Sequence, residues 1–363
     1  MSDQAEHPLA APLRVVTVGA GFFSGFHVDA WLRNDQVSFV GLADLDLDKA
    51  RTLLRDFGGE ERQTLLGQDS GDLFAQVQPQ IIDIAVPPDA HLALIEKAVQ
   101  TSARAIICQK PFCGTYELAR RAVEIAEAAG KLLVVHENFR FQPWYRAIKR
   151  ELEAGRVGTL YQITFRLRPG DGQGAKAYLS RQPYFQKMKR FLIHETAVHW
   201  IDTFRYLMGE PSSLFADLRQ LNPCIAGEDS GLFLYRFADG RRALFDGNRL
   251  ADHAADNHRL TMGDCLVEGS NGAIALNGFG ELTFRRRGST VWEPVEVNSP
   301  QEGFGGDCVY ALQRHVTDHL LHGSPIENEA SDYLRNMEIE EAVYRSAALA
   351  CAVEVAPLLA RSR

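Results

Sequence analysis

The sequence lacks the features that mark disulfide-stabilised, zinc-binding and membrane-spanning proteins. Its six cysteines are scattered without any C-x-x-C pair, so we expect reduced, mostly buried thiols instead of a disulfide framework or a zinc site. No apolar run approaches the roughly 20 residues that a membrane helix needs, and residues 1–12 contain neither a basic nor an apolar signal region. We therefore expect a cytoplasmic protein in which residues 1–12 form a flexible tail.

The sequence also lacks an excess of basic residues. Its 39 lysines and arginines are outnumbered by 47 aspartates and glutamates, which gives a formal net charge of −8. Such a chain offers no basic field to a polyanion, so nucleic acid and anionic membranes are disfavoured as main partners and a small molecule is favoured. The chain does contain 45% apolar and 24% charged side chains over 363 residues, a composition typical of globular proteins. At about 150 residues per domain, this length predicts two domains.

The first part of the chain alternates short apolar runs with amphipathic stretches, a pattern typical of βαβ units on a parallel sheet. The expected strands are Arg14–Val18, Val37–Ala43, Ile81–Val86, Ala105–Cys108 and Lys131–Val135. The expected helices between them are Ser24–Arg33, Leu47–Phe57, Ala90–Thr101 and Thr115–Ala129. Gly130 follows the last helix, where we expect a left-handed C-cap. The pattern predicts an α/β domain with a doubly wound parallel sheet.

The second part of the chain carries longer alternating runs and hairpin signals, which favour an antiparallel sheet. The dipeptides Asp239-Gly240 and Asn271-Gly272 each separate two such runs and suit a tight turn. The expected strands are Thr159–Arg168, Leu214–Leu221, Gly231–Phe237, Arg241–Leu250, Leu260–Glu268, Ala273–Leu276, Glu281–Arg287 and Thr290–Val297. The expected helices are Pro143–Ala154, Glu195–Met208, Asp307–His322 and Ala330–Ala352. We predict a large, mostly antiparallel sheet of about six or more strands.

A glycine-rich turn connects the first strand to the first helix. It reads Gly19-Ala20-Gly21-Phe22-Phe23-Ser24-Gly25. Its glycines allow a tight turn and the close approach of a pyrophosphate to the start of the helix. Ser24 stands at the third glycine of the G-x-G-x-x-G dinucleotide fingerprint. The candidate cofactor-binding residues of this turn are Gly19, Gly21, Phe22 and Phe23.

A carboxylate, Asp44, ends the second expected strand. A carboxylate at this place can accept both hydroxyls of an adenosine ribose and repels a 2′-phosphate. The cofactor is therefore expected to be NAD, with NADP disfavoured. Asp46 follows closely in an acidic run and is the alternative to Asp44 for this role.

Polar and charged residues follow the later strands of this sheet, at the carboxyl ends where doubly wound sheets bind ligands. Pro87 and His91 follow one strand, Gln109-Lys110-Pro111 the next and Asn138 the last. Lysine is seldom buried unpaired, so Lys110 directly after a buried strand favours a function over a side chain that merely reaches solvent. We assign Pro87, His91, Gln109 and Asn138 to cofactor binding.

In order and spacing, these motifs resemble the glucose-fructose oxidoreductase / inositol dehydrogenase / MocA (Gfo/Idh/MocA) family of NAD(P)-dependent sugar and polyol dehydrogenases. The resemblance covers nearly the whole chain: the Gly19 turn, Asp44, Pro87-Pro88 with His91, Lys110-Pro111, Asn138–Phe141, Gly155–Gly158, Glu195–Asp202 and Glu341–Ala347. It implies an NAD-binding Rossmann domain over 13–137 and a substrate-binding and oligomerisation domain over 138–363, with the active site between them. It also implies a homodimer or homotetramer formed through the free face of the C-terminal sheet.

Two positions depart from the pattern of that family. The usual Glu-Lys-Pro is Gln109-Lys110-Pro111 here, and the usual aspartate before the catalytic histidine is Glu195. Neither change removes a group that the chemistry requires. The neutral Gln109 does leave Lys110 with one fewer anionic neighbour.

Oxidation of an alcohol by hydride transfer requires a base for the hydroxyl proton and a cation that stabilises the developing alkoxide. We assign His199 as the base and Lys110 as the cation, although in the resembling family the lysine can share the base role. On a helix that begins near Glu195, this residue shares one face with His199 and Asp202. Glu195 is therefore assigned to positioning the substrate or His199. Asp202 is expected to bind a neighbouring backbone group or an arginine.

Two histidine groups raise the question of a metal site, and we predict none. His194 and His199 lie i and i+5, about 140° apart on a helix, whereas a zinc-protease motif needs i and i+4. His194 keeps two readings, a substrate hydrogen-bond partner or a cap of the helix start. His315, His319 and His322 do share a face, which we interpret as a polar surface because members of the resembling family use no metal there.

A basic segment separates the strand ending at Arg168 from the expected catalytic helix. From Arg168 to Arg190 it has six basic residues and one acidic residue, Asp171. Its glycines, followed by Tyr178, Tyr184 and Phe185, suit a loop that folds over a sugar. We hypothesise that this loop attracts an anionic or polyhydroxylated substrate or docks onto an acidic patch of a neighbouring subunit.

Together these features predict an NAD-dependent oxidoreductase that removes a hydride from a hydroxyl carbon of a monosaccharide or polyol, with Lys110 and His199 as the catalytic pair. A free aldose such as a pentose, oxidised to a lactone, is the favoured substrate. Substrate contacts are assigned to Lys110, Arg168, His194, Glu195 and His199. Two alternatives stay open: an enzyme that recycles its NAD while it cleaves a glycoside, and a non-catalytic dinucleotide-sensing regulatory protein.

Overall fold

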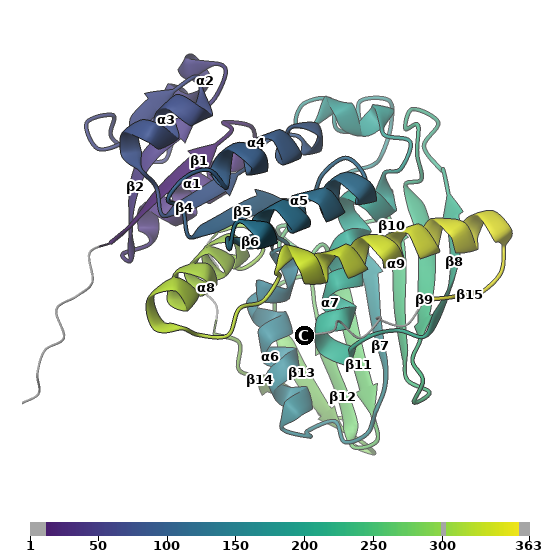
Figure 1. Ribbon diagram of the computed structural model, residues 1–363. Coiled ribbons are helices and arrows are strands. Elements are labelled where there is room, and N and C mark those ends of the chain that lie inside the picture. The colour runs from purple at the N-terminus through teal and green to yellow at the C-terminus, as the bar shows by residue number, and fades with distance from the viewer. Residues whose placement is uncertain (1–11, 299–302, 356–363) are drawn as a thin grey trace, which may run out of the picture. The chain divides into compact units, whose positions relative to one another are not determined.

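The computed structural model describes residues 12–298 and 303–355. The predicted tail of residues 1–12 therefore lies, apart from Pro12, outside the described residues. The chain divides into two compact units (Figure 1). Unit 1 comprises the described residues up to His136 together with Val309–Ser331, and unit 2 comprises Glu137–Cys308 and the residues from Asp332 onward.

Unit 1 is built on a six-stranded parallel sheet with the strand order β3-β2-β1-β4-β5-β6. Its strands are β1 (Leu13–Val18), β2 (Val37–Ala43), β3 (Leu65–Gly67), β4 (Ile81–Ile84), β5 (Ala105–Gln109) and β6 (Leu132–His136). Every residue of β4 and β5 is buried, as in strands covered on both faces. The strand order reverses between β1 and β4, the switch point at which such sheets bind ligands. The predicted doubly wound sheet is confirmed.

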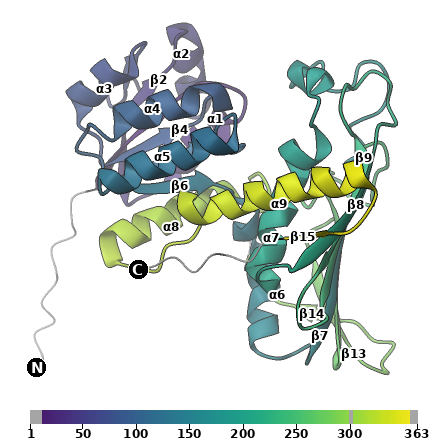
Figure 2. The ribbon, with the colours of Figure 1, turned by 45° about the vertical axis from the view of Figure 1, so that its right-hand side comes forward.

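Helices connect these strands. They are α1 (Ser24–Arg33), α2 (Leu47–Asp56), α3 (Ser70–Val77), the short 3-10 helix η1 (Pro88–Ala90), α4 (His91–Ala98) and α5 (Tyr116–Ala128). Figure 2 shows α4 and α5 side by side over the sheet. Gly130 has a φ of +64°, which confirms the expected left-handed C-cap after α5. The sequence analysis misses β3 and α3; the three residues of β3 are too few to show an alternation.

Helix α8 (Cys308–His322) belongs almost entirely to unit 1, although the predicted boundary at residue 137 separates it from that unit. That boundary assigns α8 to the C-terminal domain, whereas its residues from Val309 belong to unit 1. Side-chain contacts explain the difference. The Gln313 side-chain amide donates to the carbonyl oxygen of His27 at 3.2 Å, and Arg314 pairs with Asp35 at 2.6 Å. Local periodicity predicts a helix but not the remote residues that bind it.

Unit 2 is built on a nine-stranded sheet with the order β14-β13-β12-β11-β7-β10-β9-β8-β15. Its strands are β7 (Leu160–Leu167), β8 (Ser213–Arg219), β9 (Ser230–Arg236), β10 (Arg242–Asn248), β11 (Gly263–Gly269), β12 (Gly272–Leu276), β13 (Leu282–Arg286), β14 (Glu293–Val295) and β15 (Val353–Glu354). The β7–β10 pair is parallel and the other paired strands are antiparallel. Both predicted hairpins, β9–β10 and β11–β12, are present. The predicted mostly antiparallel sheet is confirmed.

The helices of unit 2 lie over one face of its sheet (Figures 1 and 2). They are α6 (Pro143–Glu153), α7 (Val198–Met208) and, from Asp332 onward, α9 (Ala330–Leu349). Strand residues of alternate positions, such as Ala243 and Phe245, pack with Trp200 of α7 in the core of this unit. No helix among the described residues is long and apolar enough to cross a bilayer.

All cysteines of the chain lie in the described residues, and each is a free thiol. Cys224 and Cys351 are exposed and the other four are buried. The expectation of unbridged, mostly buried thiols is confirmed.

Candidate active site

The glycine turn of unit 1 is shaped by Gly19. Its φ is +109°, and a Cβ added there would lie 2.4 Å from the carbonyl oxygen of Ala85, so only glycine fits. The Gly19 N–H donates to the carbonyl of Ala43, the last residue of β2, at 2.7 Å. At Gly21 an added Cβ would have Ser24 Oγ, 4.0 Å away, as its nearest neighbour. The backbone at Gly21 is therefore open to the close approach of a pyrophosphate.

Ser24, at the third glycine of the fingerprint, fastens this turn. Its hydroxyl accepts the Gly21 N–H at 3.2 Å and donates to the Ala85 carbonyl at 3.1 Å. The hydroxyl thus ties the start of α1 to the end of β4, an attachment that a third glycine could not make. Beside it, Phe22 is 48% exposed.

The structure distinguishes the two candidate ribose carboxylates. Asp44 Oδ2 accepts the Ala20 N–H at 2.7 Å, which places the half-buried carboxylate against the glycine turn. Asp46 instead caps α2 and accepts the N–H groups of Asp48 and Lys49 at 3.1 and 3.2 Å. Of the two carboxylates, Asp44 is thus the one bonded to the glycine turn.

A cavity of about 570 Å³ adjoins the glycine turn, a volume in the range of small-molecule sites. It is lined by residues of the turn, of α1 and of α2, namely Ala20, Gly21, Phe22, Gly25, Phe26, Asp46, Asp48, Lys49, Thr52, Leu53, Asp56 and Phe57. Three aspartates against one lysine make this lining acidic. A 2′-phosphate near it would meet like charge.

His91 has a structural role that differs from its assignment to the cofactor. Its Nδ1 accepts the Cys113 N–H at 3.2 Å, so Nε2 carries the hydrogen and donates to the Val86 carbonyl at 2.9 Å. Burial lowers the pKa of His91 to about 4, so the ring is neutral near pH 7. With both ring nitrogens bound to backbone, His91 joins the loops that follow β4 and β5.

Lys110 directly follows β5 and is half-buried. Its N–H donates to Oε1 of Gln109 at 2.6 Å, and the Lys110–Pro111 peptide bond is cis. Gln109 itself is only 8% exposed. Its side-chain oxygen is thus bonded to the backbone of Lys110, while Pro87 lies exposed after β4.

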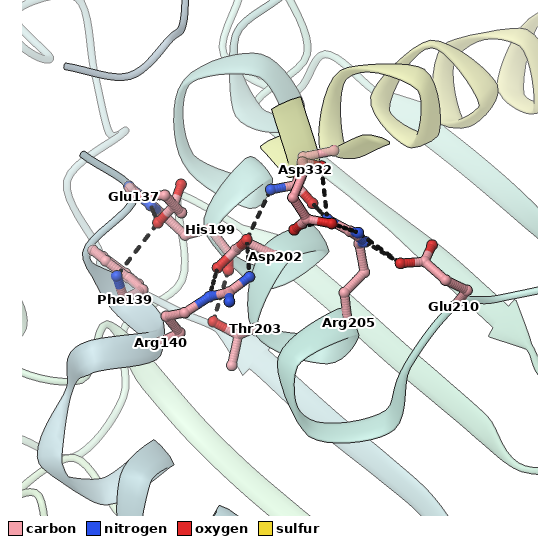
Figure 3. Close-up of polar contacts among 10 residues, drawn as sticks. Glu137, Phe139, Arg140, His199, Asp202, Thr203, Arg205, Glu210 and Asp332 are labelled. Atoms are coloured by element: carbon pink, nitrogen blue, oxygen red, sulfur yellow. Dashed lines mark hydrogen bonds and ion pairs between the residues drawn. The ribbon is translucent and has the colours of Figure 1, made fainter. Parts of the chain in front are cut away.

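The central pair of unit 2 is His199 of α7 with Glu137 (Figure 3). His199 Nδ1 lies 2.5 Å from Glu137 Oε1, and this oxygen also accepts the Phe139 N–H at 3.3 Å. His199 is 5% exposed and Glu137 is fully buried. A carboxylate can only accept from the ring, so Nδ1 carries the hydrogen and the lone pair of the neutral ring lies on Nε2. Such a histidine is prepared to accept a proton at Nε2.

Packing holds the His199 ring in one plane. The ring stacks on Phe139 with centroids 3.7 Å apart and an interplanar angle of 2°. The Thr203 hydroxyl donates to the His199 carbonyl at 2.7 Å, one turn along α7. Orientation by a carboxylate and by a stacked ring is what a general base requires.

Asp202 fastens α7 to its surroundings, as predicted. Its carboxylate accepts from Arg140 Nε and Nη2 at 2.8 and 2.6 Å, and from the Asn336 amide of α9 at 2.8 Å (Figure 3). Arg205, further along α7, bonds Asn336 Oδ1 at 2.8 Å and pairs with Glu210. These buried ionic contacts hold the helix that carries His199.

The helix itself differs from its predicted form. Residues Leu192–Ala197 form a π-helix and α7 begins at Val198, so the α-helical spacing that placed Glu195 on the face of His199 does not apply. Glu195 accepts the Thr196 hydroxyl at 2.9 Å, and the carboxylate against His199 Nδ1 is Glu137. His194 lies within the π-helix and not at its start, and its Nδ1 is 2.7 Å from Oε1 of Glu340 on α9. Neither predicted role of His194 includes this ion pair.

The segment between β7 and the π-helix packs around a buried arginine, Arg249. This residue is 2% exposed, pairs with Asp171 at 3.0 Å and donates to the hydroxyl of Tyr178 at 2.7 Å and to that of Thr196. Its guanidinium also lies over the rings of Tyr178, Phe185 and Phe191. The aromatic residues expected to cover a sugar thus form, with the exception of the 54% exposed Tyr184, a small core of their own.

The basic charge of this segment is partly neutralised inside unit 2. Arg168 pairs with Asp246 at 2.5 Å, Arg181 with Asp171 at 3.2 Å and Arg190 with Glu341. Arg168 therefore offers less charge to a substrate than the composition suggests. Lys176, Lys187 and Lys189 are exposed.

Asn138 and the histidines of α8 also have local partners. The Asn138 amide, buried and in unit 2, donates to Cys308 Sγ at 3.1 Å. His315 Nε2 accepts the Glu327 N–H at 2.9 Å, and His319 Nδ1 donates to the Ser324 carbonyl at 2.6 Å. Within residues 12–298 and 303–355, no group of three or more potential ligands is arranged to hold a metal ion.

Comparison with known proteins adds to this geometry. Residues 13–137 match the model of an oxidoreductase family with an NAD-binding Rossmann fold, and residues 145–275 match the GFO/IDH/MocA C-terminal domain. A D-apiose dehydrogenase of Paraburkholderia graminis is 31% identical over 357 residues, which are 95% of this chain and 90% of that protein. The chain belongs to the Gfo/Idh/MocA family. It is an oxidoreductase, and unit 1 holds its NAD-binding Rossmann domain.

Other Gfo/Idh/MocA proteins are similar over much of their length. An inositol 2-dehydrogenase of Rhizobium meliloti is 26% identical over 72% of this chain and 75% of its own. The structure of an oxidoreductase from Agrobacterium radiobacter in complex with NAD+, L-tartaric acid and magnesium is 27% identical, with a TM-score of 0.83 over 95% of this chain and 99% of that chain. This Gfo/Idh/MocA protein thus shares the fold of both its units with that structure.

One candidate residue of this Gfo/Idh/MocA protein, Glu137, is missed from the sequence. It directly follows β6 in the chain, and it is fully buried. An acidic residue at the carboxyl end of a buried strand was the available signal. Its partner His199 is 62 residues further along, which no local pattern links to it.

Proposed function

We propose that this protein is an NAD-dependent dehydrogenase that oxidises a hydroxyl carbon of a monosaccharide, with an aldose of pentose size as the first candidate. The observation that carries the proposal is the buried His199–Glu137 pair, in which a neutral ring has its basic lone pair on Nε2. The similarity to a D-apiose dehydrogenase supports an aldose as substrate. Unit 2 is the proposed substrate-binding part.

In the proposed reaction the substrate loses a proton from its hydroxyl group and a hydride from the carbon that carries it. Bound NAD supplies the hydride acceptor. His199 accepts the hydroxyl proton at Nε2, and the Glu137 carboxylate stabilises the imidazolium that forms. The Lys110 ammonium donates a hydrogen bond to the substrate oxygen and stabilises its developing negative charge. Glu195 and His194 are proposed to contact further hydroxyls of the sugar.

The decisive experiment follows NADH absorbance with purified protein, NAD and a panel of aldoses, polyols and sugar acids that includes D-apiose. We expect stoichiometric NADH with a free aldose. Variants Lys110→Ala and His199→Ala should lose about 10²-fold or more of kcat and still bind NAD. Turnover of a glycoside without net NADH would support a cofactor-recycling enzyme instead. NAD binding without turnover of any sugar would support a regulatory protein.

We propose NAD over NADP as the cofactor. Asp44 lies against the glycine turn, and the adjoining cavity is lined by three further aspartates and one lysine. A comparison of kcat/KM with the two cofactors should favour NAD. The variant Asp44→Ala should reduce the ratio of kcat/KM with NAD to kcat/KM with NADP, because it removes the carboxylate that is proposed to repel the 2′-phosphate of NADP. Equal use of NAD and NADP by the unaltered protein would contradict the assignment.

We also propose a homodimer or homotetramer formed through the outward face of the unit 2 sheet. A straight cross-strand row, the outward row, runs over this face through Phe215, Leu234, Leu244, Thr164, Leu266 and Ala275. Each of these residues is only partly buried. A continuous, mostly apolar row on an open sheet favours self-association.

Light scattering after size exclusion tests this interface. The unaltered protein should run as a dimer or tetramer, and Leu244→Glu should shift it toward the monomer. The matched control is Leu349→Glu on α9, where an exposed leucine lies outside the outward row. A monomeric unaltered protein, or an oligomer that tolerates Leu244→Glu, would refute the proposal.

The unbridged thiols agree with the cytoplasmic location that we propose. Two of them, Cys224 and Cys351, are exposed. Cell fractionation with an antibody would test the location, and recovery in a membrane or secreted fraction would contradict it.

A further inference from the structure

A chain of buried polar side chains in unit 1 ends at the backbone of Lys110. It links Asp83 of β4, His27 of α1 and Gln109 at the end of β5. Asp83 and His27 are fully buried, and Gln109 is 8% exposed. An ionisable residue in the middle of a buried parallel strand is costly unless it is bonded, so this arrangement requires an explanation.

The contacts run without a gap. Asp83 Oδ2 accepts from Trp31 Nε1 at 2.7 Å and lies 2.8 Å from His27 Nδ1. His27 Nε2 lies 2.9 Å from the Gln109 side-chain nitrogen. Gln109 Oε1 accepts the Lys110 N–H at 2.6 Å. Three consecutive hydrogen bonds therefore connect a buried carboxylate to the backbone of the proposed catalytic lysine.

Donor and acceptor chemistry determines the direction of every bond. The Lys110 N–H can only donate, so the carbonyl oxygen of the Gln109 amide must face it and the NH₂ group must face His27. An amide nitrogen can only donate, so His27 Nε2 is the acceptor and carries no hydrogen. The hydrogen of the neutral ring then lies on Nδ1 and is donated to Asp83. One protonation state satisfies the whole chain: carboxylate, neutral imidazole and neutral amide.

We propose that Asp83, His27 and Gln109 are positioning residues that hold the Lys110 backbone through a neutral histidine of fixed tautomer. This inference rests on the proposed role of Lys110. It explains why an amide stands at position 109. A carboxylate there would face the lone pair of His27 Nε2 and could be accommodated only by taking up an additional proton.

Other ionisable groups also surround His27. His136 of β6 lies against its ring, with centroids 4.1 Å apart and the ring planes tilted by 32°, and Lys110 follows Gln109 in the chain. Cys108 of β5 is fully buried, and burial raises the pKa of its thiol well above the usual value, so it stays neutral. From α8, the neutral Gln313 contacts the His27 carbonyl. His136 is thus the other group that could titrate against His27.

The test introduces the second carboxylate with Gln109→Glu. Two carboxylates then flank His27, and the chain of bonds persists only while one extra proton is bound between them. That proton is lost as the pH rises, so the ratio of kcat in the variant to kcat in the unaltered protein should fall. A single required proton lowers this ratio by about tenfold per pH unit beyond its titration point. The melting temperature of the variant should fall relative to the unaltered protein over the same pH range.

Matched variants assign the effect. In Asp83→Asn/Gln109→Glu only one carboxylate flanks His27, so the kcat ratio should no longer fall as the pH rises. Oδ2 of Asp83 bonds both His27 and Trp31. An amide NH₂ group at this place cannot accept from Trp31, so the melting temperature should be lower at every pH. In His136→Phe/Gln109→Glu the fall should persist. A constant kcat ratio from pH 6 to 9 in Gln109→Glu, or a fall that survives in the Asp83→Asn double variant, would overturn the proposal.

A direct measurement needs no folded variant of Gln109. Nitrogen-15 NMR of the unaltered protein, with His27 identified by its loss in His27→Asn, should show the Nδ1–H tautomer across this pH range. The Nε2–H tautomer or a charged ring would refute the chain of bonds. If Lys110→Ala keeps full turnover, the proposed function fails instead, and the tautomer and melting data still report on the positioning residues.

Discussion

Replacing Glu137 by glutamine should remove the charge behind His199 and leave its hydrogen bond. Oε1 of Glu137 accepts from both His199 Nδ1 and the Phe139 N–H (Figure 3). Both donors face the same atom, so the amide of the substituted side chain would place its oxygen there and keep the Nδ1–H tautomer. The change therefore isolates the electrostatic contribution of the carboxylate from the orientation of the ring.

The size of the effect follows from the geometry. Unit charges about 4 Å apart attract by about 4 kcal/mol at an effective dielectric constant of about 20. The neutral hydrogen bond that remains contributes about 1 kcal/mol. The imidazolium formed during proton transfer thus loses about 3 kcal/mol, which is roughly 100-fold in kcat. A base must be neutral before it accepts the proton, so in the proposed mechanism the charge of Glu137 acts mainly in the transition state, and KM and NAD affinity should change little.

Steady-state NADH formation with the sugar identified in the screen, together with NAD titration and thermal melting, measures these quantities. Glu153→Gln, an exposed carboxylate of α6 in the same unit, is the matched control and should keep full activity. A kcat within about threefold of the unaltered protein in a folded Glu137→Gln variant would refute the role of Glu137. An equal loss of NAD affinity would indicate a structural effect on the protein as a whole.

Three further predictions concern the supports of the site. Ser24→Ala should weaken NAD binding by about 1 kcal/mol, or roughly fivefold, because the hydroxyl ties Gly21 to the end of β4; fluorescence titration with unchanged affinity would contradict this. Arg249→Met should lower the free energy of unfolding by about 3 kcal/mol or more, because it leaves Asp171 without its buried cationic partner; chemical denaturation measures this loss. The pKa of His91 is about 6.5 in the unfolded chain and about 4 in the folded protein, so the unfolded chain binds the proton more readily. As the pH falls from about 6.5 to about 4, the free energy of unfolding should therefore fall by about 3 kcal/mol in total. His91→Gln should flatten this part of the plot of melting temperature against pH.

Local chemistry explains what could be predicted from the sequence. Gly19 adopts a positive φ against β4 because its neighbours in the chain form a strand, a turn and a helix in immediate succession. Asp44 lies at that turn because parallel β1 and β2 end side by side. These features depend on a few consecutive residues and on the periodicity of their elements, both of which are visible in one sequence.

Contacts between remote residues explain what was missed. Glu137 and His199 are 62 residues apart, and Asp171 and Arg249 are 78 apart. Composition from Arg168 to Arg190 indicates a basic surface, but the acidic partners of its arginines come from outside that segment or from its single aspartate. The π-helix before α7 is likewise held by tertiary packing, and an α-helical period cannot reveal it.

The three histidines near strand ends and α7 show why residue type and position alone do not assign a catalytic role. His91 binds backbone groups through both ring nitrogens, and His27 is bonded to a carboxylate on one side and an amide donor on the other. In His91, Nε2–H donates to a carbonyl and the remaining lone pair, on Nδ1, accepts a backbone N–H. In His27, the lone pair on Nε2 accepts from the Gln109 amide. A proton added to either lone pair would therefore break a buried hydrogen bond. In His199 the carboxylate of Glu137 holds Nδ1–H, so protonation at Nε2 strengthens that bond instead of breaking it. The identity of each ring's partners, more than its place in a motif, decides which histidine can act as the base.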